Sequence, residues 1–217
     1  MNKKSIFLVS AALLLGLGLS SCWKHSDTPK LTFKRENLGS VKVNGKDFEH
    51  TVYLANVPYQ RNPYLYYSEK YQMAYFPIYL SPKGSNQSTP NQYAIYLFLD
   101  ISKGIPELNK PYQLKPNDLV NSLSAKEDLF DLFKKQKSRL LTDGSQGLAV
   151  VYSRNDKAIN GITAEGSITF TSFDAKKGTC TATYQLKTTS KEKNGELTFT
   201  DGVINTKIYT DKPEKRK

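Results

Sequence analysis

Side chains that bind metals or move protons are scarce in this 217-residue chain. It has two histidines and two cysteines, so a zinc site of the usual Cys/His kind lacks ligands. The sequence also contains neither an Asp-x-Asp-x-Asp-Gly calcium loop nor a glycine-rich phosphate loop before a helix. We therefore expect no bound metal and no cofactor.

Recognisable catalytic patterns are equally scarce. His50 is the sole candidate general base outside the N-terminal segment, and it shares a predicted strand face with Phe48, Val52 and Leu54, which favours a half-buried structural histidine. The Gly-Ser-Gln-Gly run at 144–147 resembles a nucleophile elbow but lacks the residue between glycine and serine. The candidate acids for a glycosidase pair lie at predicted strand ends or turns, where side chains are usually solvated: Asp100, Glu165, Asp174 and Asp201. We expect a protein that is not an enzyme.

The N-terminus has the pattern of an export signal. Met1–Lys4 is a short cationic head, and Ile6–Leu19 is an apolar run. A helix of this run spans roughly 21 Å, shorter than the ~30 Å hydrocarbon core of a bilayer, so the pattern predicts a signal peptide and not a membrane span. The run ends in Leu-Ser-Ser-Cys at 19–22, which resembles the bacterial lipobox. We predict removal of residues 1–21 and acylation of Cys22.

Acylation makes the membrane an expected partner, because two or three acyl chains anchor a protein stably. Trp23 follows the cysteine where an Asp favours retention at the inner membrane, so we expect an outer-membrane lipoprotein. Residues 23–27 lack the acidic pair of surface-exported lipoproteins, and periplasmic or surface exposure stays open. Cys180 then has no cysteine partner, and its position between two threonines predicts a small buried side chain on a strand.

Acidic residues are the minority. The chain has 31 Lys and Arg against 20 Asp and Glu, a formal net charge of +11. Outside the cytoplasm we do not expect nucleic acid as a partner, and lipopolysaccharide or acidic glycan is the natural anionic alternative. Lysines on edge strands and turns also have a simpler role, which is to block edge-to-edge association. With 38% hydrophobic and 24% charged residues the chain fits a soluble domain, which excludes collagen-like, disordered and multi-span membrane classes.

The mature chain is predicted to have three parts: an acylated tether at 22–37, one β-rich domain at 38–210 and a basic tail at 211–217. Asn44-Gly45 is the strongest short hairpin signal. The runs 73–81 and 93–102 are apolar at nearly every position, as in strands that are covered on both faces of a sheet. Pro77 in the run 73–81 predicts a bulge or an edge segment. The predicted strands are 41–43, 47–55, 73–81, 93–102, 147–154, 165–174, 179–189, 196–200 and 203–209.

One helix interrupts the strands. Ser124–Glu127 fits a capping box, and Leu129, Phe130 and Phe133 follow as an apolar stripe, so we predict one short helix near 125–137. Residues 116–123 are compatible with a second short turn. Short connections imply antiparallel neighbours. We expect a mainly β fold, an antiparallel meander that forms either a β-sandwich or a closed up-and-down barrel of the calycin-like type, and the sequence does not separate the two.

The chain also resembles a known type. The lipobox, Gly-Ser-Val-Lys-Val-Asn-Gly-Lys at 39–46, Gly-Ser-Ile-Thr-Phe at 166–170 and Thr-Asp-Gly-Val-Ile at 200–204 resemble the domain-of-unknown-function lipoproteins of Bacteroides-type bacteria. This resemblance implies a β-rich envelope protein, and it transfers no catalytic residue to this chain.

Tyrosine is the unusual abundance. Of 14 tyrosines, eight lie between residues 53 and 79, and the polar stretch 59–71 has no clean period, which predicts a long loop. Exposed rings beside hydrogen-bonding side chains could bind a sugar, through its C–H groups and hydroxyls, or could form an aromatic-rich interface with another protein. The alternative is that the rings fold back and cap one end of the sheet. The candidate ligand-binding residues are Tyr59, Arg61, Tyr64, Tyr66, Tyr67 and Tyr71.

Three functions follow from these observations. The first is a non-catalytic, lipid-anchored binding or accessory module of the cell envelope, with a glycan, lipopolysaccharide or protein partner. The second is an envelope hydrolase whose acids are not recognisable from spacing. The third is a structural subunit of an outer-membrane assembly.

Overall fold

The computed structural model describes residues 33–55, 63–86, 91–121, 129–142, 144–153, 161–188 and 196–211. The chain divides into two units, and the second, Lys34–Leu54 with Tyr59–Lys217, contains every described residue except Phe33 and Ala55. We call this second unit the β unit, and the fold below is its fold. The lipobox, the capping box at 124–127, the tail at 212–217, Tyr59 and Arg61 lie outside the described residues.

The described part of the β unit consists of strands and two short helices. In chain order these are β1 (Phe33–Val43), β2 (Lys46–Ala55), β3 (Leu65–Ser68), β4 (Met73–Pro82), β5 (Tyr93–Asp100), β6 (Pro111–Leu114), α2 (Asp118–Asn121), α3 (Leu129–Leu140), β7 (Gly147–Ser153), β8 (Ile162–Asp174), β9 (Thr179–Thr188) and β10 (Thr198–Thr210). The fold is therefore mainly β, as the sequence predicts.

All strands belong to one 10-stranded sheet whose pairings close in a ring. The ring runs from β1 through β2, β4, β5, β7, β8, β9 and β10 back to β1, while β3 joins β4 to β10 and β6 joins β7 to β8. Most pairs are antiparallel, whereas β3 runs parallel to β10 and β6 runs parallel to β7. Closure leaves few exposed strand edges, which protects the protein from edge-to-edge pairing.

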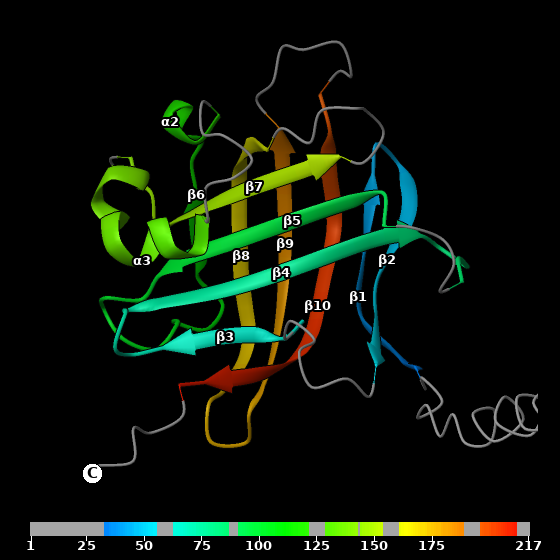
Figure 1. Cartoon of the computed structure of the whole chain (residues 1–217), viewed down its shortest axis with the longest axis horizontal. Helices are drawn as coiled ribbons and strands as arrows, with labels where there is room; N and C mark the ends of the chain where they lie inside the picture. The colour runs from blue at the N-terminus through cyan, green and yellow to red at the C-terminus, as the bar shows by residue number, and fades with distance from the viewer. Residues whose placement is uncertain are drawn as a thin grey trace, which may run out of the picture. The chain divides into compact units, whose positions relative to one another are not determined.

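Two layers face each other across the interior. Figure 1 shows β3, β4, β5 and β7 crossing in front of β8, β9 and β10, which run nearly at right angles to them. The main core fills the space between the layers, with Ile78, Ile95 and Val151 from the front and Ile168 and Phe199 from the back, all at most 1% exposed. Alternation along each strand places these side chains inward and their neighbours outward.

A second, smaller core lies on the outer side of the front layer. Helix α3 lies over one end of β4, β5 and β7 (Figure 1), and Phe133 stacks on Phe98 with ring centroids 5.2 Å apart. Met73, Leu140 and Leu148 complete this buried cluster. The near-continuous apolar runs of β4 and β5 are thereby explained, because one face meets the interior and part of the other meets α3.

Several sequence predictions are confirmed. Asn44 and Gly45 both have positive φ, 48° and 79°, as the predicted hairpin turn requires. Helix α3 contains the predicted apolar stripe and extends to Leu140, with a kink at Gln136. Pro77 pairs with Tyr96 of β5, but the pairs of β4 with β2 begin at Leu80 and those with β3 end at Tyr75, so Pro77 occupies an edge segment. Neither described helix has the length and apolar character needed to cross a bilayer.

Other predictions need correction. Strand β1 begins at Phe33, inside the segment 22–37 that was assigned to the tether. Strand β3 occupies Leu65–Ser68, inside the predicted loop 59–71, and β6 was not predicted. The two predicted strands at 196–200 and 203–209 form one strand, β10, with a bulge between Phe199 and Gly202 where Asp201 has a φ of 54°. A bulge keeps both halves in one ladder although the local backbone looks like a turn.

Candidate binding surface

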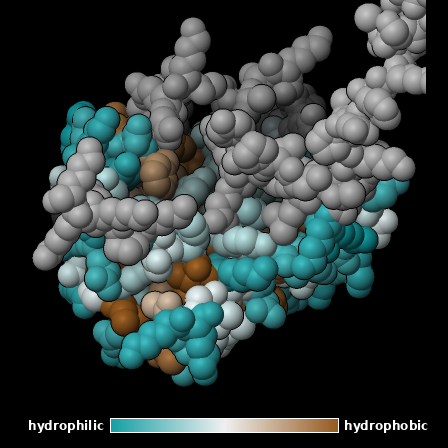
Figure 2. Space-filling view, turned by 60° about the horizontal axis from the view of Figure 1, so that its bottom comes forward, coloured by the Kyte–Doolittle hydropathy of each residue, from teal (hydrophilic) through white to brown (hydrophobic). Residues whose placement is uncertain are grey.

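The predicted tyrosine segment runs along a seam of the ring. Its strand β3 pairs antiparallel with β4 through Tyr66, Tyr67 and Ser68, and parallel with β10 through Leu65 and its two neighbours. The segment therefore connects the front layer to the end of β10. On this side of the β unit, which faces the viewer in Figure 2, hydrophobic surface is broken into small areas by hydrophilic side chains.

Tyr64 is held in a polar cluster between β1 and β10. Its hydroxyl donates to Oε2 of Glu36 over 2.6 Å, and Nζ of Lys207 donates to the other carboxylate oxygen over 3.1 Å. The same ammonium lies 4.8 Å from the centroid of the Tyr64 ring. The hydrogen bond from Tyr64 is the largest influence on Glu36 and lowers the pKa of its carboxyl. The side chain of Tyr64 thus fastens two strands together.

Tyr66 and Ser68 converge on one carboxylate. Both hydroxyls donate to Asp211, which directly follows β10, and Oγ of Ser68 also accepts from the backbone N–H of Tyr71 over 3.2 Å. Burial, followed by the hydrogen bond to Asp211, raises the pKa of Tyr66 to about 12. A phenol with so high a pKa stays protonated and keeps donating. This cluster anchors the C-terminal end of β10 to β3.

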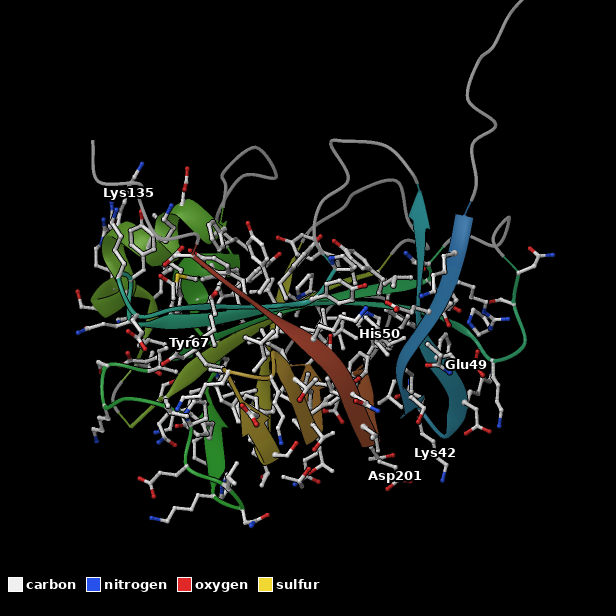
Figure 3. The ribbon with its side chains drawn as sticks, turned by 90° about the horizontal axis from the view of Figure 1, so that it is seen from below. Lys42, Glu49, His50, Tyr67, Lys135 and Asp201 are labelled. Atoms are coloured by element: carbon white, nitrogen blue, oxygen red, sulfur yellow. The ribbon has the colours of Figure 1, made fainter. Side chains whose placement is uncertain are left out.

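Tyr67 and Tyr71 have different environments. Tyr67 is 5% exposed and belongs to the main core, where its ring meets Phe173 edge to face at 5.4 Å. Figure 3 shows it among the strands. The partly buried ring of Tyr71 lies beneath Nζ of Lys134 of α3, 4.5 Å from its centroid. The expectation that Tyr67 is an exposed contact residue is wrong, because its position in β3 points it inward.

Sequence reasoning missed a second group of tyrosines. Tyr75, Tyr79, Tyr96 and Tyr152 are partly buried and lie on the outer side of β4, β5 and β7; we call them the tyrosine surface. The rings of Tyr75 and Tyr96 are nearly parallel, 7° apart with centroids at 6.1 Å. Tyrosines 75 and 79 are four residues apart on one strand and so share a face, which was the available signal. It was hidden because the surrounding runs are apolar on both faces.

The tyrosine surface has a row in which two tyrosines flank a small residue. Tyr79 of β4 pairs with Ala94 of β5, and Ala94 pairs with Tyr152 of β7. Tyr96 stands next to this row, with its ring at 90° to that of Tyr79 and at 79° to that of Tyr152. Ring centroids are 6.3 Å apart in the first pair and 5.4 Å in the second. The ring of Tyr152 extends toward Gly161, because a Cβ added at Gly161 would lie 2.7 Å from Cζ of Tyr152, so this ring lies on the side of β7 away from Ala94.

His50 does not form part of any such group. It is 1% exposed, and its ring meets Phe76 edge to face at 5.5 Å. Neither ring nitrogen has a hydrogen-bond partner among the described residues. Burial lowers the pKa of His50 to about 3, so its ring is neutral at physiological pH. The expected half-buried histidine is in fact fully buried, and Figure 3 shows it among the strands.

The candidate acids are dispersed. Asp100 accepts a hydrogen bond from Nζ of Lys137 over 2.6 Å. Burial alone would raise the pKa of the Asp100 carboxyl, but the hydrogen bonds from Lys137 and Ser102 outweigh burial, so its pKa is lowered. Asp174 receives backbone N–H groups of its own turn, and Asp201 pairs with Lys42. Glu165 lies exposed on β8. Within the described residues, no group of three or more His, Cys, Asp or Glu is placed to hold a metal ion.

Cys180 lies in the main core at 1% exposure, as its place between threonines predicts. Burial raises the pKa of its thiol to about 12, so the thiolate that would react is absent at neutral pH. The residue packs as a small hydrophobic side chain.

Comparisons of this chain with protein-family models, with curated proteins and with solved structures found no match.

Proposed function

We propose that this chain is a lipid-anchored protein of the cell envelope whose β unit binds a glycan without catalysing a reaction. The tyrosine surface carries the binding part of the proposal. Partly buried phenol rings on a rigid sheet offer apolar faces to sugar C–H groups and hydroxyls to sugar oxygens, at little cost in side-chain entropy.

The anchoring part rests on the lipobox at 19–22. Its thiol at Cys22 is the acceptor for diacylglycerol, and Trp23 in the next position favours the outer membrane. The resemblance to Bacteroides-type lipoproteins supports the same address.

The tyrosines of the seam and those of the tyrosine surface have different surroundings, which supports different roles for the two groups. Tyr64, Tyr66 and Tyr67 are engaged with Glu36, Asp211 and the core, whereas the tyrosine surface belongs to three neighbouring strands and faces outward. In this proposal the seam tyrosines stabilise the ring and the tyrosine surface makes the contact with the glycan. The residues that were predicted for binding thus have a structural task.

Anchoring is tested with one cysteine. Cys22→Ala is expected to stop incorporation of labelled palmitate and to leave an uncleaved precursor, while Cys180→Ala labels as the unchanged chain does. A Cys22→Ala chain that still takes up label would refute the anchor.

Binding is tested with the acylated full chain in detergent on an array of bacterial and host glycans. Tyr96→Ala is expected to weaken binding at least tenfold, because an anchoring aromatic side chain contributes about 2 kcal/mol or more. Thr183→Ala is the matched control, since Thr183 is exposed on β9 in the back layer, away from the tyrosine surface. Equal loss in both variants, or no bound glycan, would refute the proposal.

A further inference from the structure

The loop between β5 and β6, residues 101–110, presents two large aliphatic side chains to solvent. Ile105 is 57% exposed and Leu108 is 48% exposed, the highest exposed fractions among the large hydrophobic side chains of the described residues. A single exposed aliphatic residue needs no explanation, but two on one short loop concentrate apolar surface at one end of the β unit. We call Ile105 and Leu108 the apolar tip.

The backbone holds the apolar tip in this exposed position. Pro106, which lies between the two tip residues in the chain, is buried. The N–H of Glu107 donates a hydrogen bond to the hydroxyl of Tyr112 over 3.3 Å. The N–H of Asn109 donates to the carbonyl oxygen of Phe170 over 2.8 Å. Because the loop is fastened at these three points, the exposure of the tip belongs to the fold and does not come from a frayed loop.

Lysines lie on both sides of the apolar tip. Lys103 and Lys110 are exposed and flank the tip within the loop. Strand β6 runs antiparallel to β8, so the loop that leads into β6 and the turn that leaves β8, residues 174–178, extend from the same end of the sheet. That turn exposes Lys176 and Lys177.

The loop and the turn together keep an excess of positive charge. Their acidic residues are Glu107, which is paired with Lys110, and Asp174, which accepts backbone N–H groups of its own turn. Four lysines against two acids give the two segments a formal charge of +2. Asp100, just before the loop, is already paired with Lys137. This end of the β unit therefore combines an apolar tip with a positive rim.

This combination favours a lipid surface over a protein partner. Two aliphatic side chains are far less than the about 800 Å² that each partner contributes to a stable protein interface. A second copy of the chain, docked tip to tip about a two-fold axis, would set lysines against lysines. An anionic bilayer accepts both features, because aliphatic side chains enter its headgroup region while lysines meet the lipid phosphates.

We propose that the loop 101–110 and the turn 174–178 dock this end of the β unit on an anionic phospholipid bilayer, with Ile105 and Leu108 in the headgroup region. This inference rests on the anchoring part of the proposed function and adds to it the orientation of the β unit. Acyl chains hold the loop close to the bilayer at high effective concentration, so a contact too weak to bind by itself is sufficient.

The test places a nitrobenzoxadiazole label on the tip of the acylated full chain in vesicles of phosphatidylethanolamine and phosphatidylglycerol. In Ile105→Cys the new thiol takes the label, because Cys180 is buried and Cys22 carries the lipid in the proposed function. Val203→Cys is the matched control, since Val203 is 46% exposed on β10. The emission is expected to shift to the blue and to lose its quenching by iodide at residue 105, and to do neither at residue 203.

The contribution of charge is measured with the same label at residue 105. Lys103→Gln and Lys176→Gln are each expected to lower the ratio of bilayer-bound to free loop about fivefold, the factor that one lysine contributes near an anionic bilayer. Vesicles of phosphatidylcholine alone are expected to lower it further. Lys42→Gln is the matched control, because it removes the same charge on β1, beside Asp201, and leaves the ratio unchanged.

Three results separate the docking from the anchor. If the chain floats with the vesicles and residues 105 and 203 give the same emission, the docking is refuted while the anchor stands. If the chain does not float, the anchor falls, and the docking that rests on it falls too. A blue shift that is equal on phosphatidylcholine and grows with the protein-to-lipid ratio would mean that a second copy covers the tip, which overturns the lipid assignment. Thermal unfolding of each variant identifies a damaged fold.

Discussion

The two outward faces of the ring differ sharply in composition. The front face, on β4, β5 and β7, carries Met73, Phe98 and Leu148 beneath α3 and then the tyrosine surface. The back face, on β8, β9 and β10, presents hydroxyl and amide side chains to water: Thr169, Thr171, Ser172, Thr181, Thr183, Gln185 and Asn205. One ring thus has one aromatic and one hydroxylated outer wall.

The difference follows from the patterning of the strands. Burial alternates along β9 and, apart from their bulges, along much of β8 and β10, so the outer side chains of these strands interact with water and with each other, as in the 2.7 Å contact between the hydroxyls of Thr171 and Thr181. The front strands are apolar on both faces, so their outer face must also be shielded from water. Helix α3 covers one end of them, and partly buried tyrosines pack at the other end. The front face thus keeps partly exposed aromatic rings beside α3.

The strongest test of this comparison truncates one residue on each face. Phe133→Ala is expected to lower the free energy of unfolding by about 3–5 kcal/mol, because it leaves a cavity between α3 and Phe98. Thr183→Ala on the back face is expected to change it by at most about 0.5 kcal/mol. Urea denaturation followed by circular dichroism measures both. Similar values for the two would mean that the faces do not differ in their contribution to stability.

A second test concerns the interior that both layers share. Because the pKa of His50 is lowered to about 3 in the fold and is near 6.5 in an unfolded chain, the unfolded state binds the extra proton first. Stability is therefore complete above pH 6.5 and falls as the pH drops from 6.5 toward 3, by up to about 1.4 kcal/mol per pH unit.

His50→Phe is expected to remove this slope between pH 6.5 and pH 4.5, a range above that in which Asp100 titrates. It also removes two buried nitrogens without partners among the described residues, which favours the folded state by about 1 kcal/mol at pH 7. Denaturant titrations at several pH values supply the data. An unchanged slope in the variant would assign the acid sensitivity to other groups.

A third test is applied to the seam between the faces. Tyr66→Phe deletes the hydroxyl that donates to Asp211 and keeps the ring that contacts Phe130 and Tyr209. A hydrogen bond to a carboxylate contributes about 1.5–3 kcal/mol, so a loss near the lower end is expected because the site is only partly buried. Tyr209→Phe serves as the control on the exposed partner ring. If Tyr66→Phe is as stable as its control, the Asp211 contact does not hold β10 to β3.

The smallest effect is expected at the rim of the back face. The ion pair between Lys42 and Asp201 has a distance of 2.9 Å, and both side chains are well exposed, as Figure 3 shows. Lys42→Gln is expected to leave the melting temperature unchanged within error, because surface pairs of this kind are screened by water and salt. A clear drop would show that the bulge at Asp201 depends on this contact.

Local patterns in the sequence determined much of this protein. Runs bounded by turn residues predicted β8 and β9, Asn44-Gly45 predicted a hairpin, and the apolar stripe of Phe130 and Phe133 predicted α3. These features depend on residues within a few positions of one another, so turn chemistry and side-chain periodicity are sufficient to find them. The lipobox is a local motif of the same kind, and acylation at Cys22 stays a prediction.

The tertiary structure decided what depends on distant partners. Tyr66 pairs with Tyr209 and donates to Asp211, more than 140 positions away, and such a contact turns a stretch without periodicity into a strand. Ring closure by β1 and β10, the burial of His50 and the row of Tyr79, Ala94 and Tyr152 also need strands brought together from different parts of the chain. A single sequence carries no register between strands, and register determines which side chains meet.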